Sequence, residues 1–291
     1  MLGTELCRLL ETVGLEFFGT DRECDITESA ILRVAGKSKK VAWIVNCAAY
    51  TSVDKSEDEE ALARRINAEG AGNIAACARE LGAALIHIST DYVFAGDGDR
   101  PYFEEDPIRP IGAYGRTKAE GEALVRRECS RHFILRTAWL YGRYGNNFVY
   151  TMLRLMRERE RIGVVEDQRG NPTWSRDLAA AIVKIIDSSS ELFGTFHFTN
   201  EGETTWYHFA KEIYRLGRSK GLLKHEVEIV PLSTEGYPTK ACRPAYSVLS
   251  KSKIREVLGC TNHDWKISLE LFMSELAEQG IPAGYVGDCI K

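Results

Sequence analysis

Residues 41–51 read VAWIVNCAAYT, an apolar run that passes into small and polar residues. Parallel strands that are buried on both faces read as nearly continuous apolar runs, so this stretch predicts such a strand at about 41–47. Similar runs predict further strands at about 15–20, 84–89 and 133–139. Apolar residues spaced by three and four predict covering helices between them, at Thr4–Val13, Glu57–Leu81 and Thr117–Cys129. This alternation is typical of an α/β fold with a doubly wound parallel sheet.

The long helical stretch Glu57–Leu81 contains Gly70 and Gly72. We therefore expect either two helices or one that bends at these glycines.

After about residue 143 the alternation becomes irregular, which indicates a second, smaller C-terminal lobe. We expect helices near 147–159, 176–186, 206–216, 251–258 and 267–278, and a strand near 194–199. The sheet domain would then comprise residues 1–145 plus 175–200, and the smaller lobe 146–174 plus 201–291. No long linker separates the two parts, so we expect a ligand cleft between them.

Composition excludes several classes of protein. The 291 residues are 44% hydrophobic and 27% charged, as in ordinary globular proteins, and the formal charge is 38 − 42 = −4. No block of like charges favours a nucleic acid or an anionic membrane as partner, and no apolar run approaches the roughly 18 residues of a membrane span. The N-terminus lacks a signal pattern, so we expect a cytoplasmic location. The eight cysteines contain no C-x-x-C pair, so they predict neither a zinc site nor a redox motif.

Small and hydroxyl-bearing residues follow three of the predicted strands, in the segments 46–51, 89–94 and 137–142. Ligands of open α/β sheets bind beyond the carboxyl ends of the strands, where such residues let a flat molecule approach the backbone. Each segment taken alone is equally compatible with a plain transition from strand to loop.

Tyr114 and Lys118 are four residues apart at the start of a predicted helix, which places them on one face. An ammonium beside a phenol lowers the pKa of the phenol from about 10, so the pair could donate and accept protons. A Tyr-x-x-x-Lys also occurs by chance on solvated helix faces. Its combination with the hydroxyl of Thr90 at a strand end favours a catalytic site.

Seven ordered blocks of the chain resemble the extended short-chain dehydrogenase/reductases and, more narrowly, the dTDP-4-dehydrorhamnose reductase family. The blocks are Asn46–Asp54, Ser89–Phe94, Tyr114–Glu122, Arg136–Gly142, Gly145–Phe148, Asp167–Thr173 and Arg243-Pro244. The resemblance implies a Rossmann-type sheet with a C-terminal substrate lobe.

The resemblance also implies roles for the three residues singled out above. Tyr114 would protonate the C4 carbonyl oxygen as hydride arrives from a nicotinamide. Lys118 would hold the nicotinamide ribose and depress the pKa of Tyr114. Thr90 would hydrogen bond the reacting oxygen.

Binding residues follow from the resemblance in the same way. Cofactor contacts would come from Leu2, Gly3, Asp21, Arg22, Asp25, Ile26, Ala48, Ala49, Tyr50 and Thr51, together with Tyr114 and Lys118. Substrate contacts would come from Thr90, Asp91, Trp139, Asn146 and Asn147.

The cofactor choice between NADPH and NADH stays open. Asp21 suits the ribose 2′-hydroxyl of NAD, whereas Arg22 beside it suits the 2′-phosphate of NADP.

The chain begins Met1-Leu2-Gly3, which matches only the last glycine of the family's Gly-x-x-Gly-x-x-Gly loop. We expect that about a dozen residues, including the first strand and two glycines, precede Met1 in the complete protein. The alternative is a natural truncation with impaired cofactor binding.

Glu5 matches a position where some family members place a carboxylate near a divalent ion at a subunit contact. An acid in the first turn of a helix is also favoured by the helix dipole, without any metal. We expect the second explanation, and keep a magnesium ion and a homodimer as the alternative.

The resemblance therefore predicts an NAD(P)H-dependent oxidoreductase that reduces dTDP-4-dehydro-L-rhamnose to dTDP-L-rhamnose, a precursor of cell-wall polysaccharide. One alternative is a related sugar-nucleotide epimerase or dehydratase, which shares Tyr-x-x-x-Lys. Another is a non-catalytic NADP-binding regulatory subunit that resembles the beta subunit of methionine adenosyltransferase.

Overall fold

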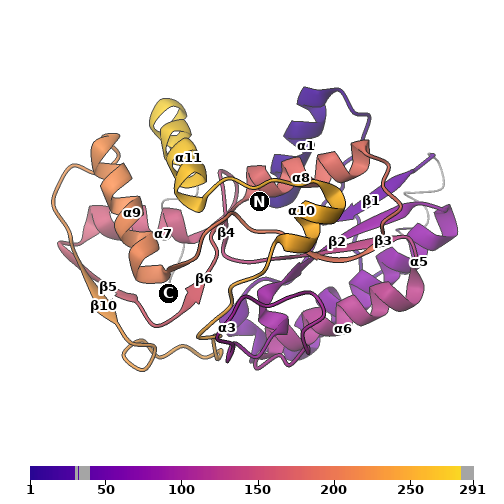
Figure 1. Ribbon diagram of the computed structural model, residues 1–291, viewed down its shortest axis with the longest axis horizontal. Coiled ribbons are helices and arrows are strands. Elements are labelled where there is room, and N and C mark those ends of the chain that lie inside the picture. Colours follow the sequence, from indigo (N-terminus) through magenta and orange to yellow (C-terminus); the bar gives the residue numbers. More distant parts are fainter. Residues whose placement is uncertain (30–31, 33–39, 283–291) are drawn as a thin grey trace.

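Within the part of the chain that the structure describes, four parallel strands form the sheet that carries the site. They are β1 (Trp43–Asn46), β2 (Ala84–Thr90), β3 (His132–Thr137) and β8 (Gly194–His197), and they lie in the order β1-β2-β3-β8. The computed structural model describes residues 1–29, 32 and 40–282 (Figure 1). Asn46 pairs with His87, and Thr90 pairs with Thr137, so the carboxyl ends of β1, β2 and β3 lie side by side.

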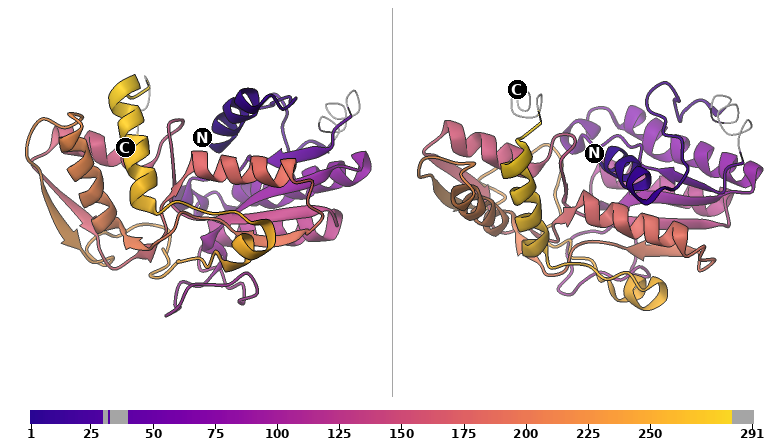
Figure 2. Two further views of the ribbon diagram at one scale, coloured as in Figure 1. Left: turned by 45° about the horizontal axis from the view of Figure 1, so that its top comes forward. Right: turned by 90° about the horizontal axis from the view of Figure 1, so that it is seen from above.

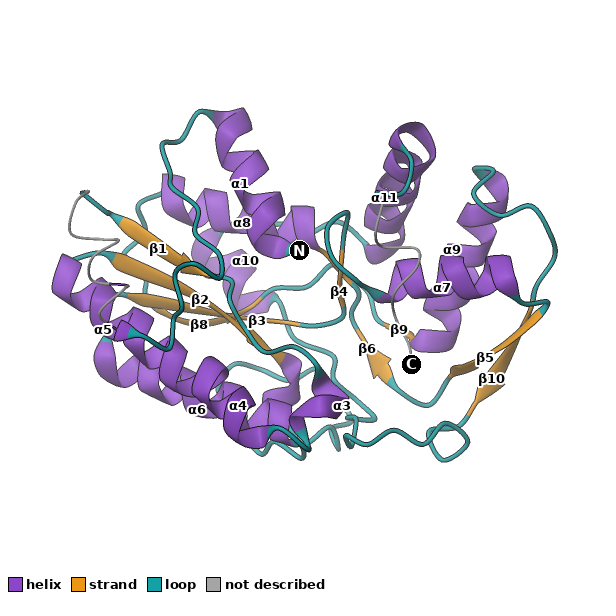
Figure 3. Cartoon of the chain, turned by 180° about the vertical axis from the view of Figure 1, so that it is seen from behind, coloured by secondary structure: helices purple, strands orange, loops and turns teal. Residues whose placement is uncertain are grey.

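Helices cover both faces of this sheet (Figure 3). On one face α1 (Leu2–Val13) packs along α8 (Ser175–Asp187), and their apolar residues join Ile86, Phe133 and Phe196 in one core. On the other face α5 (Ala71–Leu81) and α6 (Ala113–Glu128) pack on β2 through Ala75, Val125 and their neighbours. The doubly wound parallel sheet predicted from the sequence is confirmed.

The predicted long helix of residues 57–81 is a continuous helical run in three parts. These are α4 (Glu60–Arg64), a π-helical stretch η1 (Arg65–Gly70) and α5. A Cβ on Gly70 would lie 2.7 Å from the Ile26 side chain, so this glycine lets residue 26 pack directly on the helix backbone.

The predicted strand at 15–20 is wrong, because these residues form no strand. A strand needs a neighbour for its backbone N–H and C=O groups. Within the described residues, β1 pairs only with β2, so residues 15–20 are not hydrogen bonded to the sheet edge.

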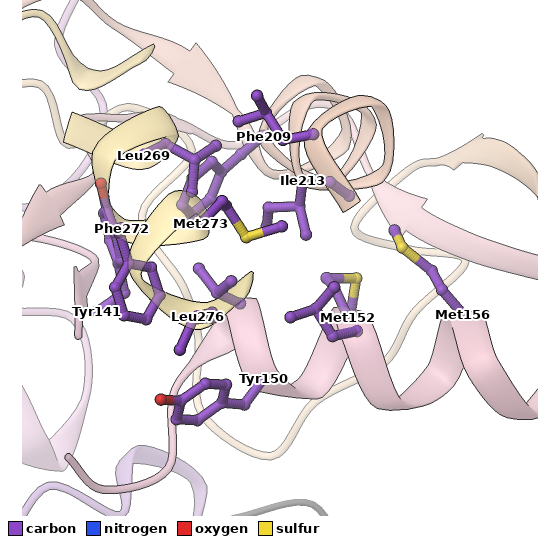
Figure 4. Close-up of a cluster of buried hydrophobic side chains, with 14 of the residues drawn as sticks. Tyr141, Tyr150, Met152, Met156, Phe209, Ile213, Leu269, Phe272, Met273 and Leu276 are labelled. Carbon is purple, nitrogen blue, oxygen red and sulfur yellow. The ribbon is translucent and has the colours of Figure 1, made fainter. Parts of the chain in front are cut away.

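A smaller lobe is built on α7 (Phe148–Glu158), α9 (Trp206–Ser219) and α11 (Trp265–Gln279), beside the parallel pair β5 (Arg161–Val165) and β10 (Glu228–Leu232). Figure 2 shows it beside the sheet lobe. Its core is a cluster of aromatic, aliphatic and Met side chains from all three helices (Figure 4). The side chains of Asn147, Thr205 and Asp264 cap the starts of α7, α9 and α11, respectively.

Two further short strand pairs lie between this lobe and the sheet. β4 (Leu140–Tyr141) pairs with β7 (Thr173–Trp174), and β6 (Arg169–Gly170) pairs with β9 (Thr204–Thr205). Further helices with described bounds are α3 (Val53–Ser56), the 3₁₀ turn η2 (Asp91–Val93) and α10 (Ser252–Leu258).

Residues 240–250, which we call the crossing segment, return from the smaller lobe to the sheet lobe. The Tyr246 amide donates to the Gly96 carbonyl, and the Ser247 amide donates to the Arg169 carbonyl. Beyond this segment, Ile254 of α10 and Cys260 lie in the core of the sheet lobe. Residues 252–260, which we expected in the smaller lobe, therefore pack on the sheet because the crossing segment carries the chain back to it.

Within the part of the chain that the structure describes, we find no helix with the length and apolar character needed to span a membrane.

Gly121 fixes how closely α6 approaches η1. A Cβ at this position would lie 2.2 Å from the Asn67 carbonyl oxygen, well inside van der Waals contact. Gly→Ala inside a helix normally stabilises by about 1 kcal/mol. We predict that Gly121→Ala instead destabilises the protein, by about 1–3 kcal/mol, because the added methyl forces the two helices apart.

Urea unfolding measures this change in the free energy of unfolding. Ala123→Ser, at an exposed position of the same helix, is the control and should change the free energy by less than about 0.5 kcal/mol. A Gly121→Ala protein more stable than the parent would contradict the close approach.

Candidate active site

The hydroxyl groups of Thr90 and Tyr114 meet at the carboxyl end of β2. Thr90 ends the strand and is buried, Tyr114 lies in the first turn of α6, and their side chains hydrogen bond. The ring of Tyr92 packs edge-on against the Tyr114 ring, with 5.5 Å between centroids. The structure thus brings together two of the three residues predicted to be catalytic.

The pKa of Tyr114 lies above its usual value. Burial raises this pKa, the hydrogen bond with Thr90 opposes the rise, and the nearby Asp91 and Tyr92 add to it. The sequence-based expectation that Lys118 draws this pKa toward neutrality therefore does not hold in this structure, because burial dominates. A phenol with a raised pKa stays protonated at neutral pH and can donate a proton.

Lys118 is the third of these residues and lies one turn further along α6. It is 2% exposed, and its Nζ donates to the Ile88 carbonyl at 2.7 Å. Burial lowers the pKa of Lys118 to about 8, against the opposing influence of Glu122 and Cys47. The amine is anchored to β2 two residues before Thr90. Strand β2 and helix α6 therefore fix the positions of the Thr90 hydroxyl, the Tyr114 hydroxyl and the Lys118 amine relative to the sheet.

A buried ion pair fixes α6 to the sheet below this site. The Arg136 guanidinium on β3 makes two hydrogen bonds of 2.8 Å to the Glu122 carboxylate, and Ser89 donates to the same carboxylate at 2.6 Å. Burial alone would raise the pKa of Glu122, but its bonds to Arg136 and Ser89 lower it to about 2. The carboxylate is therefore ionised and holds one helix face against two strands.

Asp91 follows Thr90 and is also buried. Burial raises its pKa to about 6, although hydrogen bonds with Ser247 and Thr90 lower it in part. One carboxylate oxygen of Asp91 has no hydrogen-bond partner. A buried acceptor without a partner is costly, so this oxygen marks a place where a ligand hydroxyl would bind.

The predicted cofactor segment 48–51 leaves the carboxyl end of β1 beside the buried Asn46. Ala48 and Thr51 are exposed, while Ala49 and Tyr50 are half-buried. The side-chain oxygen of Asn67 accepts from the Tyr50 amide at 2.8 Å, and its nitrogen donates to the Tyr50 carbonyl and the Thr117 hydroxyl. Sequence analysis missed Asn67, although an Asn inside a helical pattern is a signal worth following.

The other predicted cofactor residues lie at two places. Asp21, Arg22 and Asp25 are exposed in the segment after α1, and Ile26 packs against Gly70 of η1. Leu2 and Gly3 begin α1. Leu2 is buried in the sheet-lobe core, whereas a Cβ on Gly3 would lie 3.6 Å from that of Cys47 at the end of β1.

Trp139 is held in a strained conformation beyond β3. Its φ of 45° lies in the left-handed region, which a bulky residue adopts only when its surroundings compensate. Its ring stacks on Trp206 of α9 with centroids 3.5 Å apart, and a Cβ on Gly170 would lie 2.6 Å from the indole. Trp206, which the sequence analysis missed, therefore holds a predicted substrate residue from the other lobe.

The two predicted asparagines differ in their surroundings. Asn146 is exposed, whereas Asn147 is buried. The side chain of Asn147 accepts from the Tyr150 amide at the start of α7 and donates to the carbonyls of Gly142 and Gly145. Asn147 thus shapes the loop that carries Asn146.

Glu5, the candidate metal ligand, is buried and accepts from Arg176 at 2.9 Å. Arg176 also contacts Glu275 of α11, so this ion pair joins the two lobes. Among the residues that the structure describes, no three His, Cys, Asp or Glu side chains gather closely enough to hold a metal ion.

A hollow of about 1030 Å³ lies in the smaller lobe, between α9, β10 and the start of α11. Glu166, Glu203, Lys211 and Arg215 are among its lining residues. None of the predicted catalytic or binding residues lines it, so we place the site at the carboxyl edge of the sheet, where Thr90, Asp91 and Tyr114 lie together.

The comparisons with known proteins agree with this geometry. The family model described as the RmlD substrate binding domain matches residues 1–278. The dTDP-4-dehydrorhamnose reductase of Aggregatibacter actinomycetemcomitans is 40% identical over 279 residues, which cover 92% of this chain and 94% of the relative. The chain belongs to the dTDP-4-dehydrorhamnose reductase family.

Other relatives extend this result. The crystal structure of a dTDP-4-dehydrorhamnose reductase from Bacillus anthracis in complex with NADP is 40% identical, with a TM-score of 0.88 over 94% of this chain and 95% of that one. A probable dTDP-4,6-dihydroxy-2-methyloxan-3-one 4-ketoreductase from Streptomyces antibioticus is also 40% identical, over 97% of this chain and 95% of that one. Relatives of equal identity thus carry names that refer to different ketosugars.

The stacked pair Trp139 and Trp206 yields a prediction. Two indoles in van der Waals contact couple their electronic transitions, which gives a paired band in the circular dichroism spectrum. We predict that Trp206→Leu abolishes this band, because one of the two indoles is removed. The side chain of Trp139 should also become more mobile, because stacking against Trp206 holds this strained residue in place.

Trp43→Phe, in β1 outside the site, is the matched control and should leave the paired band unchanged. A spectrum that responds equally to both substitutions would show that the two indoles are not coupled in solution.

Proposed function

We propose that the protein is an NAD(P)H-dependent reductase that converts the C4 keto group of dTDP-4-dehydro-L-rhamnose to the hydroxyl of dTDP-L-rhamnose. The observation that carries this proposal is the hydrogen-bonded pair of Tyr114 and Thr90, with Lys118 on the same helix face. Family membership and the names of the relatives support the same reaction.

The raised pKa of Tyr114 suits a reductase. Reduction of a ketone needs a proton donor at the carbonyl oxygen, and burial keeps the Tyr114 phenol protonated. Thr90 would hydrogen bond the carbonyl oxygen of the substrate and align it with the Tyr114 hydroxyl. Lys118, with its Nζ anchored at the Ile88 carbonyl, would hold the nicotinamide ribose beside this pair.

The residues beside this pair fit a dinucleotide. The exposed small residues Ala48 and Thr51 leave the backbone accessible at the end of β1, and Lys118 has donors beyond the one given to Ile88. Asp21, Arg22, Asp25 and Ile26 would hold the adenosine end. When bound, NAD(P)H supplies the hydride for the reaction.

The sugar nucleotide would lie against the opposite side of the site. The unpartnered oxygen of Asp91 would accept from a sugar hydroxyl, and the Trp139 indole would pack on the sugar ring. Asn146 and Asn147 would approach the same ligand from the loop before α7. The crossing segment closes this region through the hydrogen bond between Ser247 and Asp91.

The adjacent Asp21 and Arg22 are both exposed, so the chain can accept either a ribose hydroxyl or a phosphate. The NADP complex of the Bacillus anthracis relative supports NADPH. We place the reaction in the cytoplasm, where nucleotide-linked sugars and NAD(P)H are both found.

The proposal predicts the behaviour of Tyr114→Phe. Loss of the hydroxyl removes the proton donor and little packing, so turnover of freshly prepared dTDP-4-dehydro-L-rhamnose should fall by at least about 10²-fold. Cofactor affinity should change little, because the ring remains. Loss of reduced-nicotinamide absorbance measures turnover, and fluorescence titration measures cofactor binding.

Tyr207→Phe, at a half-buried position in the smaller lobe, is the control and should keep parental turnover. Parental turnover in Tyr114→Phe would show that the proton comes from elsewhere. No turnover of any dTDP-4-ketosugar by the parent protein would refute the proposed function itself.

A further inference from the structure

His87 is a buried imidazole with no part in the mechanism above. It lies in the middle of β2, is 1% exposed, and stands between Asn46 and Lys118. Its Nδ1 is 3.1 Å from the Asn46 side-chain nitrogen, and its Nε2 is 3.5 Å from the Lys118 Nζ. A chain of polar contacts therefore runs from β1 through β2 to α6.

The Ala48 amide decides the direction of these hydrogen bonds. Its N–H donates to the Asn46 Oδ1 at 3.0 Å, so the amide nitrogen of Asn46 must face His87. That nitrogen can only donate, so the Nδ1 of His87 accepts. A neutral imidazole that accepts at Nδ1 carries its proton on Nε2.

His87 is neutral in this environment. Burial holds its pKa well below the usual value, and the charge of Lys118 acts in the same direction. Among the other charged or titratable groups that face it, Glu122 opposes this effect, whereas His132 on β3 and Arg126 on α6 support it.

The Nε2–H of His87 consequently points at Lys118. An ammonium has only donors, whereas a neutral amine has a lone pair that can accept this hydrogen. Lys118 already donates to the Ile88 carbonyl, so only its neutral form satisfies both neighbours at once. Two other groups act on this lysine, the carboxylate of Glu122 on α6 and the thiol of Cys47 after β1, and both favour the charged form.

We propose that His87, with its tautomer fixed by Asn46, is a positioning residue that favours the neutral amine of Lys118 and so sets the pH at which this lysine loses its charge. The inference rests on the proposed function, because it acts through Lys118, one of the three residues to which that function assigns a role. It gives a role to the contact between Asn46 and His87, which are 41 residues apart in the sequence.

The tautomer can be observed directly. A long-range proton–nitrogen correlation spectrum of protein with ¹⁵N-labelled histidine distinguishes the two neutral forms, and it needs neither substrate nor a variant. We expect the Nε2–H form of His87 in the parent protein. The Nδ1–H form would overturn the proposal.

Asn46→Asp reverses the direction of the hydrogen bonds that run from residue 46 through His87 to Lys118. A carboxylate at position 46 accepts from Nδ1–H, which leaves the Nε2 lone pair facing Lys118 and favours the ammonium. The titration midpoint of Lys118, followed by NMR of labelled lysine, should rise by about one pH unit. In the pH profile of kcat, the alkaline limb should move to higher pH by the same amount. A merely structural role of His87 would not produce this shift.

A double-variant cycle separates this effect from that of the added charge. In a His87→Leu background no imidazole transmits the change, so Asn46→Asp should shift the midpoint by less than about 0.3 unit. An equal upward shift in both backgrounds would mean that charge alone acts, and would overturn the proposal. Asn73→Asp, on α5, adds the same charge outside the chain of contacts and should leave the midpoint unchanged.

The two hypotheses fail in different ways. The tautomer and the lysine titration are measured without turnover, so an inactive protein would refute the proposed function and leave them standing. An active protein with the Nδ1–H tautomer would refute only the role of His87.

Discussion

The position of α6 on β2 is the constraint on which the site depends. Its inner face is unusually polar: Lys118 bonds the Ile88 carbonyl and Glu122 bonds both Ser89 and Arg136. A buried ion pair repays its desolvation only when its geometry is good and its remaining hydrogen-bonding positions are filled, and these contacts meet both conditions. They fix the helix against sliding or rotation, so that Tyr114 in its first turn meets Thr90 at the end of the strand.

The second constraint is the return of the chain across both lobes. The crossing segment bonds Arg169 of the smaller lobe, Gly96 of the sheet lobe and, through Arg243, Asp54 of α3. Trp206 likewise reaches from α9 to stack on Trp139 beyond β3. The substrate side of the site is thus assembled from segments that are distant in the sequence, whereas the proton-donating side is built within one βα unit.

This difference explains how far the sequence could predict the molecule. Strands near 41–47, 84–89 and 133–139, and a helix that carries both Tyr114 and Lys118, are local patterns, and the structure shows each of them. The strand expected at 15–20 was wrong, because a β-branched or aromatic run is a strand only where a neighbour pairs with it. Asn67, His87 and Trp206 were missed because their importance arises from partners 17 to 67 residues away, which no local pattern records.

The central claim is that this site delivers hydride to carbon 4 of the sugar while Tyr114 protonates the oxygen. NMR of the product formed with NADPH deuterated at the transferred position tests it most directly. The account predicts dTDP-L-rhamnose with a single deuterium, bound to carbon 4. Deuterium at another carbon, or consumption of the substrate without any transfer of deuterium, would contradict it.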